Sequence, residues 1–302
     1  LFVPSGTTVY IDGGARVYGN IFTEGAHDVN IFGRGEVHPD GRGAGVWVRR
    51  SKNVRIDGIV VSQLPIGQCD SVELTNVKSI SYYGWGDGMD VFSSSNVILD
   101  GVFCRNSDDC AAVYASTQGF KGGSNNVLVK NATLWADVAH PINIGGHGDP
   151  NGMDTVQNVT FRNIDILDQA EKQIDYQGCL AINPGDNTLV RNITFENIRI
   201  EDFRNGQLVN FRISFNPKYC VSTGRGIQNV LVKDVTYNGS GENLSIIAGY
   251  DENHKISGIR FVNLVVNGRK ITDDMPGKPK WYKTGDMAGI FVGEHVENIS
   301  FE

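Results

Sequence analysis

One short pattern of polar and apolar residues repeats along most of the chain. Each copy places a polar residue, in most copies Asn, before an apolar β-branched residue, after which polar and apolar residues alternate. Such alternation is typical of a half-buried β-strand. A second short strand often follows, as in Asn163–Ile166 and Asn197–Ile200. The copies begin at His27, Lys52, Ser95, Asn125, Gln157, Arg191, Gln228, Ser257 and Glu297.

The copies recur at intervals of 25–43 residues, and the longest interval holds two turns because Asn76–Ile80 lies inside it. A strand-bearing period of this length predicts a solenoid. We expect an all-β fold, a single-stranded right-handed parallel β-helix of about ten coils. Successive strands would stack about 4.8 Å apart, with the apolar residues pointing inward and Asn side chains forming ladders at the corners.

A β-sandwich or a β-propeller is the competing interpretation. Sandwich strands are joined by hairpins of about two to five residues, which the copies lack, and no Trp-Asp blade signature occurs. We therefore favour the β-helix, as one catalytic domain over residues 1–302. The chain begins at Leu1 without Met and ends within a strand pattern, so we expect a piece of a longer polypeptide.

The composition agrees with this fold. The 32 Val and 26 Ile outnumber the 13 Ala and 13 Leu, and 37 Gly and 27 Asn are suited to tight corners. The net charge of −7 and the scattered basic residues argue against a nucleic-acid partner. No apolar run approaches the roughly 18 residues of a membrane span, so we expect no membrane partner. Five Cys without a C-x-x-C motif predict small buried side chains with at most one or two disulfides.

Acidic residues concentrate in two neighbouring segments, Gly84–Phe92 and Arg105–Tyr114. Asp90 and Asp109 each stand at the start of a strand, 19 residues apart, which is about one coil. We expect them to stack on one face, with Asp108 beside them. Three carboxylates so close together either raise a pKa or require a metal.

This grouping points to glycoside hydrolysis. A protonated carboxylic acid next to carboxylates that hold a water molecule is the apparatus of an inverting glycosidase. We predict Asp90, Asp108 and Asp109 as catalytic residues, a poly- or oligosaccharide substrate, and neither cofactor nor metal. An Asp-Gly turn explains Asp87 as well as substrate binding does.

The next coil adds His140, which lies 31 residues after Asp109 and just ahead of a short strand. It should share the face of the acids, where it would tune an acid or bind a sugar hydroxyl, and we count it as catalytic. The predicted substrate-binding residues are Trp85, Asp87, Tyr114, Asn143, His147, Lys172, Asp175 and Arg212.

The segments Gly86–Asp90, Ser107–Cys110 and Ala139–Gly145 together resemble glycoside hydrolase family 28, the polygalacturonases. They are also similar to family 49, the dextranase and isopullulanase group, which shares the fold and the three aspartates. The resemblance covers roughly residues 1–270. It implies that Asp108 is the general acid, that Asp90 and Asp109 hold and activate the water, and that His140 matches the family 28 histidine.

The sequence departs from family 28 at two places. Where that family has an Arg-Ile-Lys segment that grips the substrate carboxylate, this chain has Gln173-Ile174-Asp175-Tyr176, and the Asn of the family's Asn-Thr-Asp segment is absent. A neutral or differently charged glycan is therefore as consistent with the sequence as a pectic one.

Two other functions are compatible with an acidic β-helix. A calcium-dependent polysaccharide lyase would hold Ca²⁺ on the acids and use a base, for which Arg105 and Lys121 are nearby. A non-catalytic glycan-binding solenoid would bind without turnover. From the implied substrate we expect a secreted or periplasmic protein, and we expect a monomer.

Overall fold

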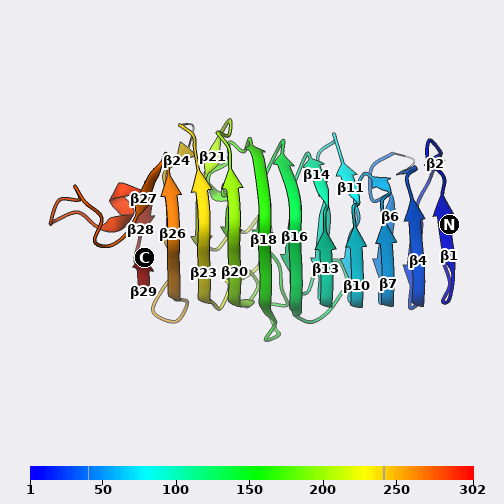
Figure 1. The fold of residues 1–302 in the computed structure, drawn as a ribbon. Coiled ribbons are helices and arrows are strands. Elements are labelled where there is room, and N and C mark those ends of the chain that lie inside the picture. Colours follow the sequence, from blue (N-terminus) through cyan, green and yellow to red (C-terminus); the bar gives the residue numbers. More distant parts are fainter. Residues whose placement is uncertain (40, 241) are drawn as a thin grey trace.

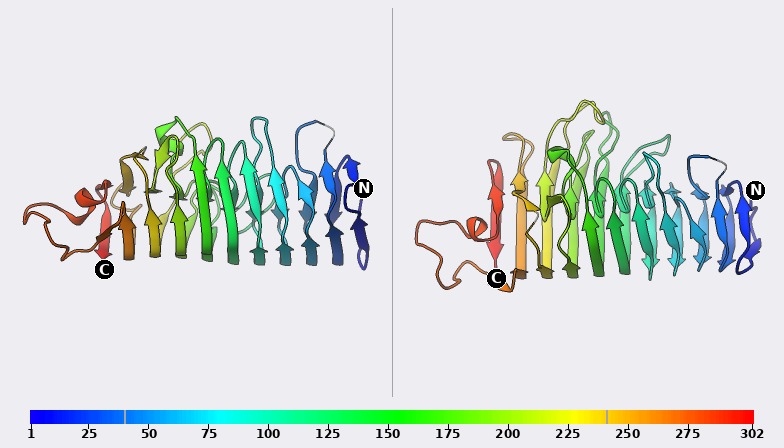
Figure 2. Two further views of the ribbon diagram at one scale, coloured as in Figure 1. Left: turned by 45° about the horizontal axis from the view of Figure 1, so that its top comes forward. Right: turned by 90° about the horizontal axis from the view of Figure 1, so that it is seen from above.

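The computed structural model describes residues 1–39, 41–240 and 242–302, and in it the chain winds into an elongated stack of coils. The N-terminus lies at one end of the stack and the C-terminus at the other (Figure 1), as the two further views of Figure 2 also show. Apart from one antiparallel strand, the strands of the two large sheets pair in parallel with those of the next coil. Parallel crossovers are right-handed. The predicted right-handed parallel β-helix of about ten coils is confirmed.

A ten-stranded sheet, here called the site sheet, carries one strand from each of ten coils. Its strands are β3 (Ile21–Glu24), β6 (Val46–Arg49), β9 (Ile66–Gly67), β12 (Met89–Phe92), β15 (Ala111–Tyr114), β17 (Ile142–Ile144), β19 (Leu180–Ile182), β22 (Val209–Arg212), β25 (Ser245–Ala248) and β28 (Ile290–Val292).

A 17-stranded sheet forms the other faces. Its main column contains β1 (Thr8–Ile11), β4 (His27–Gly33), β7 (Lys52–Asp57), β10 (Asp70–Thr75), β13 (Ser95–Asp100), β16 (Ser124–Ala136), β18 (Thr155–Gln169), β20 (Leu189–Ile200), β23 (Gly226–Tyr237), β26 (Ile256–Val266) and β29 (Val296–Phe301). A shorter column contains β2 (Arg16–Tyr18), β5 (Glu36–His38), β8 (Val60–Val61), β11 (Lys78–Ile80) and β14 (Phe103–Asn106), and it continues into the second half of β16.

The smaller elements are β21 (Gly206–Gln207), which pairs with β24 (Glu242–Asn243), and the antiparallel β27 (Arg269–Ile271). Two 3₁₀ turns, η1 (Ile174–Tyr176) and η2 (Thr284–Met287), complete the described structure. No helix in the described part of the chain is long and apolar enough to cross a membrane.

The core is a continuous column of side chains in register, which explains the surplus of β-branched residues. Burial of apolar side chains contributes most of the favourable free energy of folding. In a solenoid each coil buries these side chains against only its neighbouring coils. One row of the column consists of Val29, Val54, Val72, Val97, Val127, Val159, Ile193, Val230, Ile259 and Ile299.

The predicted Asn ladders are present at the corners. Asn163 Nδ2 donates to Asn131 Oδ1 at 2.7 Å, and Asn197 Nδ2 donates to Asn163 Oδ1 at 3.3 Å. These residues have φ near +55°, a conformation that Asn tolerates better than most residues. All five Cys are free and four of them are buried, as expected for small apolar side chains.

Candidate active site

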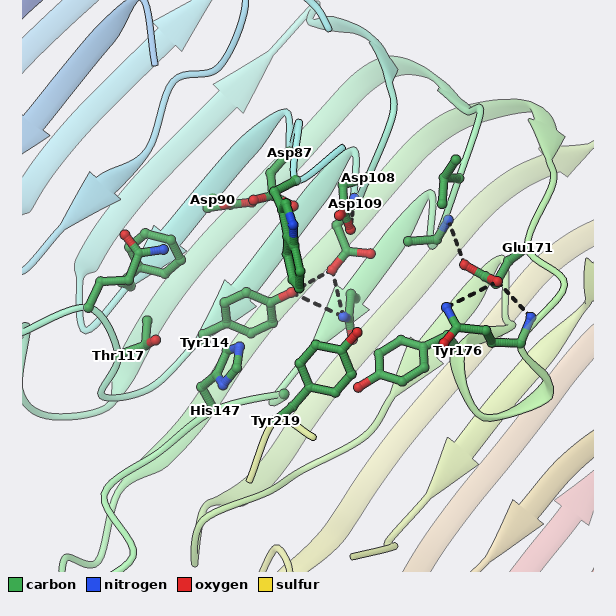
Figure 3. Close-up of a pocket in the computed structure, with 18 residues that line it drawn as sticks. Asp87, Asp90, Asp108, Asp109, Tyr114, Thr117, His147, Glu171, Tyr176 and Tyr219 are labelled. Carbon is green, nitrogen blue, oxygen red and sulfur yellow. Dashed lines mark hydrogen bonds between the residues drawn. The ribbon is translucent and has the colours of Figure 1, made fainter. Parts of the chain in front are cut away.

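The acidic residues lie in a cavity of about 370 Å³ on the outer face of the site sheet (Figure 3). One wall comes from the segments that precede the sheet strands, and the other from the segments that follow them. The lining residues are Trp85, Asp87, Asp90, Phe92, Asp108, Asp109, Tyr114, Thr117, Gln118, Val138, Ala139, Asn143, Gly146, His147, Glu171, Gln173, Tyr176 and Tyr219.

The register of the sheet corrects one expectation. Asp90 pairs with Ala112, not with Asp109, so the coil here is 22 residues long and not 19. The same register continues ahead of the strands, where Gly88 N donates to Asp109 O at 2.7 Å. Asp87, which the sequence left between a turn and a substrate-binding role, thereby joins the acids. The carboxyl groups of Asp87, Asp108 and Asp109 contain oxygens that all lie within 4.8 Å of one another.

Gly88 allows this close approach of the two coils. A Cβ atom at Gly88 would lie 2.2 Å from Cys110 O and 2.6 Å from Asn106 Oδ1, so any side chain would push the coils apart. Gly88 is therefore needed for packing between coils.

Four hydrogen bonds fix the buried carboxylate of Asp109. Its Oδ1 accepts from the backbone N–H of His140 at 3.0 Å and lies 2.7 Å from His140 Nδ1. Its Oδ2 accepts from Tyr114 Oη at 2.5 Å and from Asn143 Nδ2 at 2.7 Å. A carboxylate has about four acceptor positions, so this group is oriented on all sides. His140 contacts Asp109, as expected of a residue that tunes an acid, but it lies behind this carboxylate and not on the cavity face where the sequence placed it.

These contacts give the two adjacent acids, Asp108 and Asp109, different pKa values. Burial acts to raise the pKa of Asp109, but the His140 ring and the other donors outweigh burial and hold this pKa below its usual range. Burial, and then the charge of Asp109, raise the pKa of Asp108 to about 7. At neutral or slightly acidic pH the pair therefore consists of a carboxylate next to a carboxylic acid.

The pKa values of the other two acids, Asp87 and Asp90, are raised as that of Asp108 is. Burial, followed by the charges of Asp108 and Asp109, raises the pKa of Asp87 well above its ordinary value. Burial, followed by the charge of Asp87, does the same for Asp90, whose side chain is 4% exposed. Such a cluster holds several protons that isolated aspartates would lose, and its members titrate as a group.

Several polar atoms at the site lack partners within the described protein. Asp90 Oδ1, His140 Nε2 and Asn143 Oδ1 are buried and make no hydrogen bond. Unpaired buried polar atoms are costly, and they are common where a ligand supplies the partner. The triad of Asp87, Asp108 and Asp109 also has the oxygen chemistry to hold a divalent cation.

The predicted substrate-binding residues divide into two groups. Those that line the cavity are Trp85, Asp87, Tyr114, Asn143 and His147. The other three, Lys172, Asp175 and Arg212, are not part of its lining. Arg212 Nη1 forms an ion pair with Asp175 Oδ1 at 2.5 Å, so these two side chains bind each other.

Glu171 and Tyr219 line the cavity without having been predicted. Glu171 lies in the coil after His140 and is 4% exposed, and its carboxylate accepts from Gln173 N at 2.6 Å and Ala139 N at 3.3 Å. Tyr219 reaches the cavity from a long segment after β22, packing its ring 4.7 Å from that of Tyr176. A coil count places Glu171, but nothing in the sequence shows how the segment of Tyr219 folds back.

The chain matches the family described as glycosyl hydrolases family 28 over residues 47–275. It is 26% identical over 216 residues to a polygalacturonase from Juniperus ashei, covering 68% of this chain and 39% of that protein. It is 25% identical over 216 residues to an exopolygalacturonase from Cochliobolus carbonum, covering 60% and 46%. The chain thus spans less than half the length of these two relatives.

Solved structures agree on the fold. The family 28 exopolygalacturonase of Yersinia enterocolitica superposes with a TM-score of 0.68 at 13% identity, covering 99% of this chain and 70% of that one. The polygalacturonase of Erwinia carotovora ssp. carotovora gives a TM-score of 0.63 at 13% identity, covering 97% and 85%. The family match extends over about three quarters of the chain and includes all four clustered aspartates and His140. This chain belongs to glycosyl hydrolases family 28.

Proposed function

We propose that this chain hydrolyses O-glycosidic bonds in a poly- or oligosaccharide, with Asp108 as the general acid. The observation that carries the proposal is the pairing of Asp108, whose pKa is raised to about 7, with an ionised Asp109 in one cavity. A general acid works best when its pKa lies near the working pH.

The proposed reaction uses three carboxyl groups. Asp108 donates its proton to the glycosidic oxygen as the bond from that oxygen to the anomeric carbon breaks. A water held between Asp87 and Asp109 attacks the anomeric carbon and gives its proton to Asp109, the ionised member of this pair. The water-holding role that the sequence assigned to Asp90 passes to Asp87, because Asp87 lies beside Asp109. His140 acts as a positioning residue that keeps Asp109 ionised.

We propose inversion at the anomeric carbon. A third carboxylate is useful for holding a water, but it has no use when a carboxylate attacks directly. Oxygens of the three acids lie within 4.8 Å of one another. The carboxyl groups of inverting enzymes usually lie roughly 6.5–9.5 Å apart. The anomeric configuration of the first product therefore tests the proposed inversion directly.

A second candidate concerns the substrate. The names of the relatives point to galacturonan, whereas none of the described lining residues is Lys or Arg. Five acidic side chains face the cavity: Asp87, Asp90, Asp108, Asp109 and Glu171. A sugar carboxylate seated among them would lack a cationic partner and would be repelled. This observation favours a neutral sugar at the cleaved bond.

The test is incubation of the 302-residue chain with polygalacturonate, xylogalacturonan, dextran and pullulan. Release of reducing sugar, with the inverted anomer seen first by NMR, supports the proposed mechanism. Retention of configuration would contradict inversion, and an unsaturated ultraviolet-absorbing product that EDTA abolishes would indicate a calcium-dependent lyase. Exclusive cleavage of polygalacturonate would overturn the neutral-sugar assignment.

We also propose that the protein acts outside the cytoplasm, either secreted or periplasmic, because its polymeric substrates would be found there. We further propose that it acts as a monomer. Size-exclusion chromatography of the purified chain and fractionation of source cells test these two statements.

A further inference from the structure

The cavity is closed toward the N-terminal end of the stack by residues 115–123, here called the Phe120 segment. From the end of β15 this segment folds back over the site sheet. It places the Phe120 ring, which is 4% exposed, directly over Gly67 of β9. A Cβ atom at Gly67 would lie 2.3 Å from the ring, so glycine is required beneath it. The ring also stacks on Phe92, with centroids 6.2 Å apart.

Arg50 holds the Phe120 segment in this position. Its Nη2 donates to Gly119 O at 3.2 Å, and its guanidinium carbon lies 4.9 Å from the Phe120 ring centroid. Thr117 and Gln118, which precede the ring, line the cavity. The outer face of β9 is therefore filled by protein where an open groove would continue.

Residues 213–225, here called the Tyr219 segment, close the opposite side. They fold back from β22 onto earlier coils, where Asp186 Oδ1 accepts from Val221 N at 2.8 Å and Gly146 O accepts from Cys220 Sγ at 3.3 Å. The Tyr219 ring then meets Tyr176, which belongs to the opposite wall. Beneath this contact the free space is about 50 Å³, far less than in the main cavity.

Trp85 restricts the remaining opening. Its ring centroid lies 6.4 Å from that of Tyr219. Side chains from the two walls therefore meet at the cavity, where Figure 3 labels Tyr219 and the acids. Trp85 has φ of +62°, a conformation that bulky residues rarely adopt. Backbone strain of this kind is found at functional sites, and here it presents an exposed ring at the mouth.

From these contacts we infer that the chain acts on the ends of glycan chains and not within them. This inference rests on the proposed function. A polymer cleaved internally must extend from the acids in both directions, and both directions along the site sheet are blocked by the Phe120 and Tyr219 segments. The cavity of about 370 Å³ lies near the lower end of the roughly 300–1,000 Å³ typical of small-ligand sites, as expected for a chain end.

The experiment follows viscosity and reducing ends together during digestion of polygalacturonate, xylogalacturonan, dextran and pullulan. End-wise action releases short products of one size from the first minutes, and viscosity falls little for each bond cleaved. Rapid viscosity loss with a ladder of intermediate oligomers would overturn this inference alone. Absence of cleavage on every polymer would overturn the proposed function, and this inference with it.

Two variants test whether the named segments cause the end-wise action. Tyr219→Ala and Phe120→Ala should each increase the viscosity lost per bond cleaved by two-fold or more, because one end of the cavity opens. Tyr250→Ala, which removes an exposed ring outside the lining, is the matched control and should leave the ratio unchanged. If Phe120→Ala fails to fold, as judged by circular dichroism, Tyr219→Ala decides, and an unchanged ratio in that variant overturns the assignment.

Discussion

Two columns of polar side chains run along this β-helix, and they differ in chemistry. The Asn column contains Asn131, Asn163 and Asn197, and in it Asn163 donates to Asn131 of the previous coil and accepts from Asn197 of the next. The acid column contains Asp87, Asp90, Asp108 and Asp109, with Asp87 beside Asp109, and ionised carboxylates offer acceptors without donors. The Asn column satisfies itself, whereas the acid column needs protons or outside donors.

This difference distinguishes a group of residues that stabilises the fold from one that serves function. Hydrogen bonds along the Asn column each contribute modestly, about 0.5–1.5 kcal/mol, and repeat from coil to coil. The acid column is confined to two adjacent coils. Asp90 and Asp109 are buried and Asp87 and Asp108 half-buried, and the pKa of three of the four is raised. A fold that can stack neutral amides has no structural need for such a cluster, so the acids are explained by chemistry.

The largest expected effect comes from neutralising the acid column. Asp108→Asn should lower kcat/KM by about 10³-fold or more, because general acid catalysis typically contributes 10²–10⁴-fold and the amide has no acidic proton to give. Initial rates on a cleaved panel glycan measure this loss, with circular dichroism confirming the fold. A variant that retained more than a tenth of the activity would show that Asp108 is not the acid.

A second, smaller effect should follow from removing the group that keeps Asp109 ionised. His140→Ala should lower kcat/KM by about 10–100-fold and move the acid limb of the pH profile to higher pH, because the pKa of Asp109 rises without the His140 charge and hydrogen bond.

The pH profile separates positioning from simple structural damage. His140→Gln keeps a donor side chain and should recover part of the rate. A uniform loss of activity at every pH would contradict the positioning role of His140 and indicate a packing defect.

The sequence predicted the fold well because every coil repeats the same requirements. An inward β-branched residue and a corner Asn recur often enough to reveal both the register and the ladder. Asp108 and Asp109 lie side by side in the cavity as expected, whereas His140 contacts Asp109 from behind and does not share the cavity face that the sequence predicted for it.

The failures arose where the repeat is interrupted. The assumed coil of 19 residues is 22, and this difference of three moves Asp87 into the position given to Asp90. The Gly-rich segment ahead of β12 hides the length of its coil. The walls of the cavity could not be predicted either. The Tyr219 segment is held by contacts with residues as far away in sequence as Gly146.

The third prediction concerns stability. Unlike the hydrogen bonds of the Asn column, the acid column should lower the free energy of unfolding at neutral pH. The pKa of Asp108 is about 7 in the folded chain and near 3.9 when unfolded, so its contribution to stability is present below pH 4 and is lost as pH rises toward 7. Asp108→Asn should therefore be more stable than the parent at pH 8, by roughly 1–3 kcal/mol given about 1.4 kcal/mol per pKa unit.

Urea unfolding at pH 4 and pH 8 measures this difference. The advantage of the variant should shrink at the lower pH, where Asp108 is protonated in the folded parent and about half protonated in the unfolded chain. Equal stabilities at both pH values would mean that the acid column carries no strain, and the contrast with the Asn column would lose its basis.

The smallest effect is expected from making the Asn column resemble the acid column at one position. Asn163→Asp keeps the side-chain size and tolerates the positive φ, but the introduced carboxylate cannot donate to Asn131 Oδ1 and would place two acceptors face to face. We expect a loss of about 0.5–1.5 kcal/mol in the free energy of unfolding at pH 7, with hydrolysis unchanged because Asn163 lies outside the cavity lining. Lowering the pH through the pKa of the new carboxyl should restore part of the loss, because the protonated group can donate again. If the variant were as stable as the parent at pH 7, the ladder hydrogen bonds would not be what distinguishes the two columns.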